Sequence, residues 1–313
     1  MYFSLVFVAG LLAAGPARTD HYPKTVLKNE DLTLTVYLPD AEKGFYRGNR
    51  FDWAGVVGNI EFRGHRLFGP WKDTHDPTHH DDIIGPVEDF GPIGYAEAKE
   101  GEPFFKIGIG EAIKGEGVKF GDLGTRDVTI KPNEVVFKHS IRSGTGYGYQ
   151  YTKRLEVEPG HGGFRLHHVL TNTGAKVIDT DCYNHNFYNV DADGVGPNYV
   201  VTCAGPLKPK GTRGRFDEVM KIRDGRILEF TKPLNAGDDV YGTLDGLGGL
   251  TGNFIVRHGP SGVITEITGD APLEKVNFWA TRETVCPEPF VRIRLKPGES
   301  KTWSIRYAFK LSD

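Results

Sequence analysis

Hydrophobic side chains recur at every second residue in several segments of this chain, and this period of two constrains its fold more than any other feature. Residues 32–38, LTLTVYL, alternate near the start, and residues 291–295 and 303–309 alternate near the end. Residues 147–151 and 155–158 follow the same pattern. Successive side chains of a strand point to opposite faces of a sheet, so each of these five segments is predicted to be a half-buried strand.

Short turn sequences separate the predicted strands, such as Pro159-Gly160, Asn172-Thr173-Gly174 and Lys296-Pro297-Gly298. Many short antiparallel strands with closely spaced turns predict an all-β sandwich or barrel. The best helical window is residues 215–228. No linker or change of composition divides the rest of the chain, so we predict one domain over residues 20–313.

The charge balance argues against nucleic acid as a partner. The chain has 38 Lys and Arg against 41 Asp and Glu, a formal net charge of -3, and no basic run interleaved with aromatic residues. Proteins that bind nucleic acid usually present a basic face. We therefore expect no nucleic-acid partner.

The N-terminus has the composition of a secretory signal peptide. Residues 3–14, FSLVFVAGLLAA, are apolar but too short to span a bilayer, and small residues then precede Arg18-Thr19-Asp20. Residues 1–19 are therefore expected to be removed, which places the mature chain outside the cytoplasm, secreted or periplasmic, with no membrane span. The alternative is a buried first strand or a mis-annotated start.

The three cysteines, Cys182, Cys203 and Cys286, do not form a CxxC pair. This spacing argues against both a zinc site and a disulfide framework. One bridge remains possible in an oxidising compartment, and the sequence does not select the pair.

A loop rich in histidine and carboxylates is the first candidate for a binding site. Residues 71–94, WKDTHDPTHHDDIIGPVEDFGPIG, include His79 and His80. Loops on a rigid sheet often carry binding residues. The loop is expected to contribute to a sugar site; a divalent metal site and a merely solvated polar loop are the alternatives.

A second candidate is the polar and aromatic run Tyr183-Asn184-His185-Asn186-Phe187-Tyr188, which follows a predicted strand and turn. Amide groups hydrogen-bond sugar hydroxyls, and aromatic faces stack on the C–H faces of sugars. Histidine titrates near neutral pH and can pass a proton to a ring oxygen. The run therefore predicts sugar binding with His185 as a proton donor, although a lone strand histidine is more often structural.

A third candidate is Glu288, which lies between Pro287 and Pro289 before the alternating segment at Val291. Prolines restrict the backbone on both sides, so this carboxylate is expected to be held at a strand entrance as a general base. The alternative is a glutamate that keeps an edge strand from aggregating. In the segment from residue 47 to residue 66, Arg50 and Trp53 form a pairing that is common in sugar clefts; the alternative is that Phe51 and Trp53 belong to the core and Arg50 is a surface cation.

These motifs resemble the galactose-mutarotase-like superfamily. Residues 183–189, YNHNFYN, are similar to its Asn-His-Thr-Tyr-Phe-Asn element, and residues 285–289, VCPEP, are similar to the Val-Cys-Val-Glu-Pro segment of its hexose-6-phosphate branch. Residues 296–300 with 303–309 match its closing hairpin. The resemblance implies a β-supersandwich of antiparallel strands.

The resemblance also implies roles for individual residues. The proton-donating histidine falls on His185 and the base on Glu288, with Glu283 as the alternative because Arg282-Glu283-Thr284 can be laid on the galactose branch's Glu-Thr-Gln segment. A second sugar-contacting histidine falls on His79 or His80. The substrate arginine is Arg66 or Arg50.

The predicted function is therefore the interconversion of α and β anomers of a free aldose by acid/base ring opening, without metal or nucleotide cofactor. Asn184, Asn186 and Tyr188 are expected to contact the sugar. The alternatives on the same fold are a carbohydrate-binding protein without activity and a polysaccharide lyase or hydrolase. The expected partner is a small sugar or glycan; no feature indicates the oligomeric state. The lack of a Lys/Arg cluster beside the motifs argues against a phosphosugar.

Overall fold

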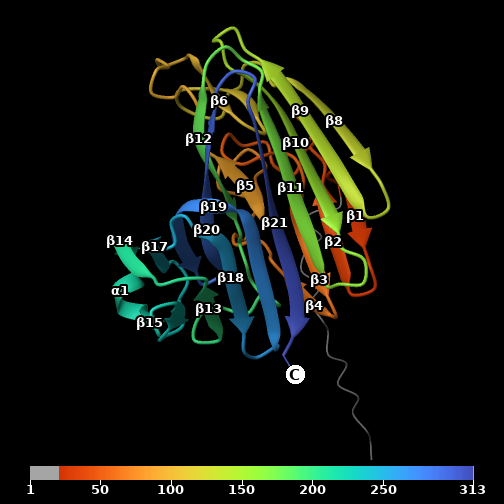
Figure 1. The fold of residues 1–313 in the computed structure, drawn as a ribbon. Helices are drawn as coiled ribbons and strands as arrows, with labels where there is room; N and C mark the ends of the chain where they lie inside the picture. Colours follow the sequence, from red (N-terminus) through yellow and green to blue (C-terminus); the bar gives the residue numbers. More distant parts are fainter. Residues whose placement is uncertain (1–20, 313) are drawn as a thin grey trace, which may run out of the picture.

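The computed structural model describes residues 21–312, and antiparallel strands form nearly all of its regular structure (Figure 1). This confirms the predicted all-β class. Fifteen strands form one continuous hydrogen-bonded network. The predicted signal peptide lies outside the described residues, and among the described residues no helix is long and apolar enough to cross a membrane.

The network contains two sheet paths that share the long strand β19. The longer path runs β15-β16-β13-β18-β19-β21-β11-β10-β9-β8. Its strands are β15 (Met220–Arg223), β16 (Ile227–Phe230), β13 (Tyr199–Cys203), β18 (Thr251–His258), β19 (Val263–Thr281), β21 (Ser300–Leu311), β11 (Gly163–Asn172), β10 (Gly148–Val157), β9 (Glu134–Arg142) and β8 (Thr125–Ile130).

The shorter path runs β14-β17-β19-β20-β12-β5. Its further strands are β14 (Lys208–Gly214), β17 (Asp239–Asp245), β20 (Thr284–Leu295), β12 (Ile178–His185) and β5 (Val87–Phe90). A separate sheet contains β1 (Lys24–Lys28), β2 (Leu32–Tyr37), β3 (Val56–Phe62) and β4 (His65–Leu67), and β6 (Pro103–Lys106) pairs with β7 (Gly110–Ile113).

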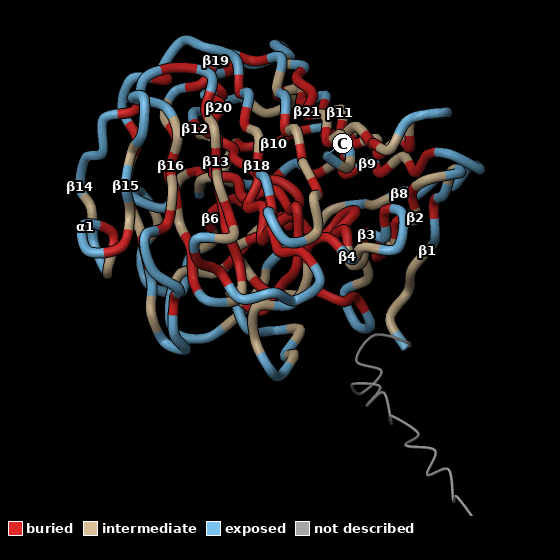
Figure 2. The backbone as a smooth tube through the Cα atoms, turned by 90° about the horizontal axis from the view of Figure 1, so that it is seen from below, coloured by how far each residue is buried: buried red, intermediate tan, exposed pale blue. Residues whose placement is uncertain are grey.

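Strand β19 passes from one layer to the other. Its first half pairs with β18 and β21, and its second half pairs with β17 and β20, with irregular register before Lys275. Bulges of this kind bend a strand and increase its twist. The buried backbone accordingly gathers in the middle of the molecule, with exposed segments around it (Figure 2).

Strand β10 is one continuous strand, where the sequence pattern predicts two. Along it Tyr149, Tyr151, Lys153, Leu155 and Val157 are all buried and share one face. The alternation is unbroken in space, but the buried lysine interrupts the apolar pattern in the sequence. The two-strand prediction is wrong for this reason.

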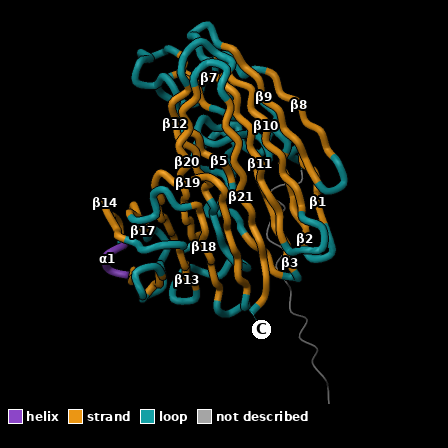
Figure 3. The backbone as a smooth tube through the Cα atoms, viewed as in Figure 1, coloured by secondary structure: helices purple, strands orange, loops and turns teal. Residues whose placement is uncertain are grey.

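The helical window at residues 215–228 is also mostly strand. Only α1 (Phe216–Val219), a single turn beside β14, is helical (Figure 3). The chain then forms the hairpin β15–β16 through Asp224 and Gly225, which both have positive φ, 51° and 68°. Asp-Gly is a strong two-residue hairpin signal because both positions tolerate this backbone.

Candidate functional site

A cavity of about 380 Å³ opens on one face of the shorter sheet path. This size is typical of small-molecule sites. Its walls come from five of the six strands and from the loops at residues 50, 71 and 81 that cover them. The lining residues are Arg50, Trp71, Asp81, Tyr183, His185, Phe187, Arg213, Tyr241, Asn277, Trp279 and Glu288.

Strand register places the catalytic candidates in one row across the sheet. Thr243 lies opposite Asn277, and Asn277 lies opposite Glu288. Tyr183 of β12 pairs with Phe290 of β20. When this antiparallel register is extended by two residues, His185 lies opposite Glu288. Nε2 of His185 accordingly lies 3.3 Å from Oε1 of Glu288, within hydrogen-bonding distance.

His185 is held by aromatic rings. The ring of Phe187 stacks on it with centroids 3.8 Å apart, and Trp279 and Phe51 present edge contacts at 5.3 and 5.8 Å. Phe187 has a φ of 41°, a costly backbone for a bulky residue, and this turn after the end of β12 brings its ring back over His185. Burial, and secondarily the charge of Arg50, lowers the pKa of His185 well below its ordinary value.

Glu288 has the opposite shift. Burial raises its pKa to about 8, although the charge of Arg50 opposes the rise. At neutral pH the two side chains therefore share one proton, and in the free protein that proton lies on Glu288. This corrects the expectation of a protonated histidine facing a carboxylate, because charge separation is unfavourable at this depth.

Arg50 is the centre of an ionic network beside this pair. Its Nε donates to Asp89 at 2.8 Å, its Nη1 donates to Asp81, and its Nη2 donates to the hydroxyl of Tyr183 at 2.8 Å. Asp89 also accepts from Lys106 at 2.8 Å. Burial alone would raise the pKa of Asp89, but Lys106 and Arg50 hold it below its ordinary value. The guanidinium is thus fixed and its charge is fully compensated.

Asn184, Asn186 and Tyr188 do not line the cavity. The amide of Asn184 points to Glu88 in the interior at 3.4 Å, and Asn186 donates to the carbonyl of Pro287 and accepts from Tyr307. Tyr188 is fully buried and accepts from Thr265. Residues adjacent to His185 in a strand point to the opposite face, so a clamp of neighbouring residues cannot form. Asn186 instead ties β20 to β21.

Two residues of the histidine-rich loop line the cavity, Trp71 and Asp81. Its histidines do not. His79 and His80 are exposed on the loop surface, where His80 lies 2.9 Å from Asp81. His75 fixes the position of the loop, because its Nδ1 lies 3.0 Å from Oδ1 of Asp82 and its Nε2 lies 2.9 Å from the carbonyl oxygen of Phe45. Within residues 21–312 no group of three or more His, Cys, Asp or Glu side chains is placed to hold a metal.

Arg66 and Glu283 lie in a different cavity, of about 450 Å³, which also includes Asn189. Of the two candidate arginines, therefore, Arg50 lies beside His185, and of the two candidate bases only Glu288 does. Glu288 also lies inside β20, four residues after its start, where the sequence pattern predicts a strand entrance.

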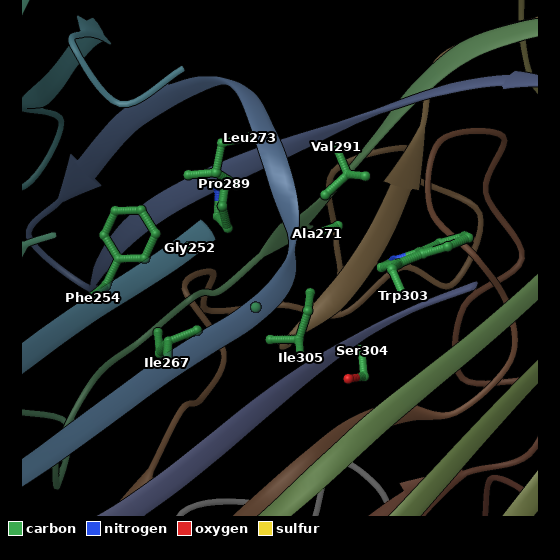
Figure 4. Close-up of a pocket in the computed structure, with 11 residues that line it drawn as sticks. Gly252, Phe254, Ile267, Ala271, Leu273, Pro289, Val291, Trp303, Ser304 and Ile305 are labelled. Carbon is green, nitrogen blue, oxygen red and sulfur yellow. The ribbon is translucent and has the colours of Figure 1, made fainter. Parts of the chain in front are cut away.

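An apolar depression between β18, β19, β20 and β21 is too small for a sugar. Its walls are nearly all carbon, with the hydroxyl of Ser304 among them (Figure 4), and its space of about 10 Å³ corresponds to about one water. The three cysteines are buried and unpaired.

Four cavity residues carry no sequence motif: Arg213, Tyr241, Asn277 and Trp279. Asn277 and Trp279 alternate with the buried Val276, Phe278 and Ala280, so a polar residue and an indole on one side of an apolar strand are the signal that could have identified them. Arg213 lies in a glycine-flanked stretch with no such signal.

No model of a protein family and no curated protein matches the chain, but solved structures do. The Slr1438 protein of Synechocystis is 12% identical with a TM-score of 0.58, and the match covers 99% of this chain and 100% of that one. A galactose mutarotase-like protein of Lactobacillus casei is 13% identical, with a TM-score of 0.54 over 92% and 100% of the two chains. A galactose mutarotase related enzyme of Lactobacillus acidophilus is 11% identical, with a TM-score of 0.52 over 92% and 97%. At these identities the likeness shows the fold alone: the chain has the β-sandwich fold of galactose mutarotase-like proteins.

Proposed function

We propose that this protein interconverts the α and β anomers of an aldose through the pair His185 and Glu288. The observation that supports this best is their separation of 3.3 Å at the base of an aromatic-walled cavity. The anomeric hydroxyl and the ring oxygen are bonded to one carbon, so an acid and a base that serve them must also lie side by side. Glycosidase carboxyl pairs, by contrast, are about 5 Å or more apart.

The reaction needs one proton on the pair, and the opposite pKa shifts supply it. In the state with the proton on Glu288, His185 takes the proton of the anomeric hydroxyl while Glu288 donates to the ring oxygen. The ring opens to the aldehyde, the C1–C2 bond rotates, and closure on the other face reverses both transfers. A proton that starts on His185 gives the same sequence with the roles exchanged.

The walls suit a sugar ring. Trp71, Phe187 and Trp279 offer faces or edges to C–H groups, and Trp71 packs edge-on against Trp279 with centroids 5.3 Å apart. The Arg50–Asp81 pair offers fixed donors and acceptors to hydroxyls. Localisation outside the cytoplasm remains a proposal from the sequence of residues 1–19.

The test is saturation-transfer NMR of anomer exchange across a panel of free aldoses, for wild type and His185→Ala. We expect wild type to accelerate exchange of at least one aldose and His185→Ala to lose about 10²–10⁴-fold of that rate. His167→Ala, a half-buried histidine on β11, is the matched control and should keep it. Line broadening from sugar binding without any exchange would leave a carbohydrate-binding protein instead.

The pH dependence of exchange is a separate prediction. Above about pH 8 Glu288 loses its proton, the pair has no acid left, and the enzymatic rate should fall about tenfold per pH unit. Because the pKa of His185 is well below 6.5, the rate should stay level through pH 6. Exchange rates corrected for buffer catalysis between pH 4.5 and 9.5 measure the level region and the alkaline fall of this profile. A fall in rate centred near pH 6.5 would contradict the assigned protonation states of His185 and Glu288.

A further inference from the structure

Arg213 is a cation in the cavity wall that forms no ion pair with the residues that the structure describes. It comes from the edge strand β14 and its guanidinium stacks over the ring of Tyr241, 4.0 Å from the centroid. No carboxylate of residues 21–312 forms an ion pair with it, although its charge acts on Glu288 and opposes the rise in the pKa of that group. The stacked ring fixes the guanidinium plane and leaves its N–H groups open to the cavity.

The other arginine in the wall differs in this respect. Arg50 donates to two carboxylates and a tyrosine hydroxyl, so its charge is already compensated. Asp81 in the cavity wall and Asp89 beside it both pair with Arg50, and the third carboxyl group, Glu288, keeps its proton at neutral pH because burial raises its pKa to about 8. Strand β14 contributes Arg213 to the cavity lining and no carboxylate, so the cavity is polarised along the sheet with a positive charge at the β14 end.

Strand β14 adds a second positive charge on the same side. Lys210 pairs with Thr243, whose hydroxyl donates to Asn277 in the cavity wall, so Lys210 lies on the cavity face of the strand. It is exposed, and the closest carboxylate, that of Asp245, is 3.9 Å away. The sequence of β14, KPKGTRG, contains no acidic residue.

We propose that the aldose taken by this site is a uronic acid whose carboxylate is bound by Arg213, with its anomeric carbon at His185 and Glu288; this rests on the proposed function. A guanidinium presents two parallel N–H groups that match the two oxygens of a carboxylate. Arg213 offers one guanidinium with one positive charge, so it fits one planar monoanion better than a phosphate dianion. Arg213 would then be the specificity-determining residue of the site.

The test compares glucuronate with glucuronamide and glucose, and galacturonate with galactose, by NMR titration for binding and saturation transfer for exchange. We expect wild type to prefer a uronate over its neutral counterparts by about 10- to 100-fold, the usual range for a charge-assisted pair. Arg213→Gln should weaken binding and exchange of uronates much more than those of neutral sugars and so remove most of that preference, and Arg213→Lys should restore it in part. Arg294→Gln, an exposed arginine at the far end of β20, is the matched control.

The two readouts separate this inference from the function on which it rests. Exchange of neutral aldoses with no preference for uronates, or a preference unaffected by Arg213→Gln, would overturn the inference and leave the mutarotase. Uronate binding that depends on Arg213 without any exchange would support the carboxylate site and reject the mutarotase. Stronger action on glucose 6-phosphate than on glucuronate would overturn the carboxylate assignment.

Discussion

Replacement of Glu288 by glutamine is expected to slow anomer exchange by about 10²–10⁴-fold, because the amide keeps the shape of the side chain but can neither give nor take the proton. The same saturation-transfer measurement gives the rate. Sugar binding, measured by titration, should change much less, since the cavity walls stay in place.

The same substitution should stabilise the fold at alkaline pH. The pKa of Glu288 is about 8 when folded against an ordinary 4.5, so between these values the folded chain keeps a proton that the unfolded chain releases. Wild-type stability therefore falls as pH rises from 4.5 through 8, and Glu288→Gln escapes this loss. We expect its stability relative to wild type to be about 3–5 kcal/mol greater at pH 9 than at pH 4, measured by urea unfolding.

The comparison between two pH values cancels any packing change that the amide introduces. Glu274→Gln, a more exposed glutamate on the neighbouring strand β19, should show neither the rate loss nor the pH-dependent gain. If Glu288→Gln exchanges anomers at the wild-type rate while Glu283→Gln does not, the proton-transfer role belongs to Glu283 and not to Glu288. A stability difference that is the same at both pH values would mean that Glu288 titrates normally.

The strands and the two residues of the proposed catalytic pair follow from the sequence because both depend on local pattern. Residues 32–37, 291–295 and 303–309 alternate and form parts of β2, β20 and β21. His185 and Glu288 each lie within a motif that the resemblance identifies. Their separation of 3.3 Å, however, is a property of the register between β12 and β20, which no local pattern contains.

The rest of the site could not be predicted for the same reason. Asn184 and Asn186 are adjacent to His185 in the sequence but on the opposite face in the sheet, so nearness along the chain misleads in a strand. Arg213 and Trp279 are distant in sequence and reach the cavity through the order β14-β17-β19-β20-β12. The continuity of β10 could not be predicted either, because Lys153 lies on its buried face. A lysine is rarely buried without charged partners, and the partners of Lys153 come from other elements of the chain.

Lys153 and its partners form an ionic cluster on the interior side of the shorter sheet path. The side chains of Lys153, Glu88 and Asp52 are fully buried; Lys153 contacts Glu88 directly, lies 3.6 Å from Asp52 and donates to the carbonyl of Ala54 at 2.7 Å. Burial raises the pKa of Asp52 to about 6 against the opposing charge of Lys153. Burial would lower the pKa of Lys153, but Glu88 and Asp52 raise it above its ordinary value. The lysine is therefore charged and compensates the two carboxyl groups.

Lys153→Met is expected to lower the free energy of unfolding by about 3–5 kcal/mol at pH 7, because methionine fills the space but leaves the carboxyl groups buried without a cation. That is a large part of the stability of a typical domain, about 5–15 kcal/mol. With the cation gone, the folded-state pKa of Asp52 rises further above its unfolded value. The variant's deficit should therefore grow as pH rises and shrink toward pH 5. Urea unfolding at several pH values measures it.

The double variant Lys153→Met/Glu88→Gln separates the missing charge from the missing side chain. It removes the uncompensated carboxylate, so it should recover part of the stability that Lys153→Met loses, as buried ion pairs replaced by neutral groups often do. Lys138→Met, an exposed lysine on the neighbouring strand β9, should stay within about 0.5 kcal/mol of wild type. If Lys153→Met lowers the free energy of unfolding by less than about 1 kcal/mol, or by the same amount at every pH, then Lys153 is not the required counter-ion of the buried carboxyl groups.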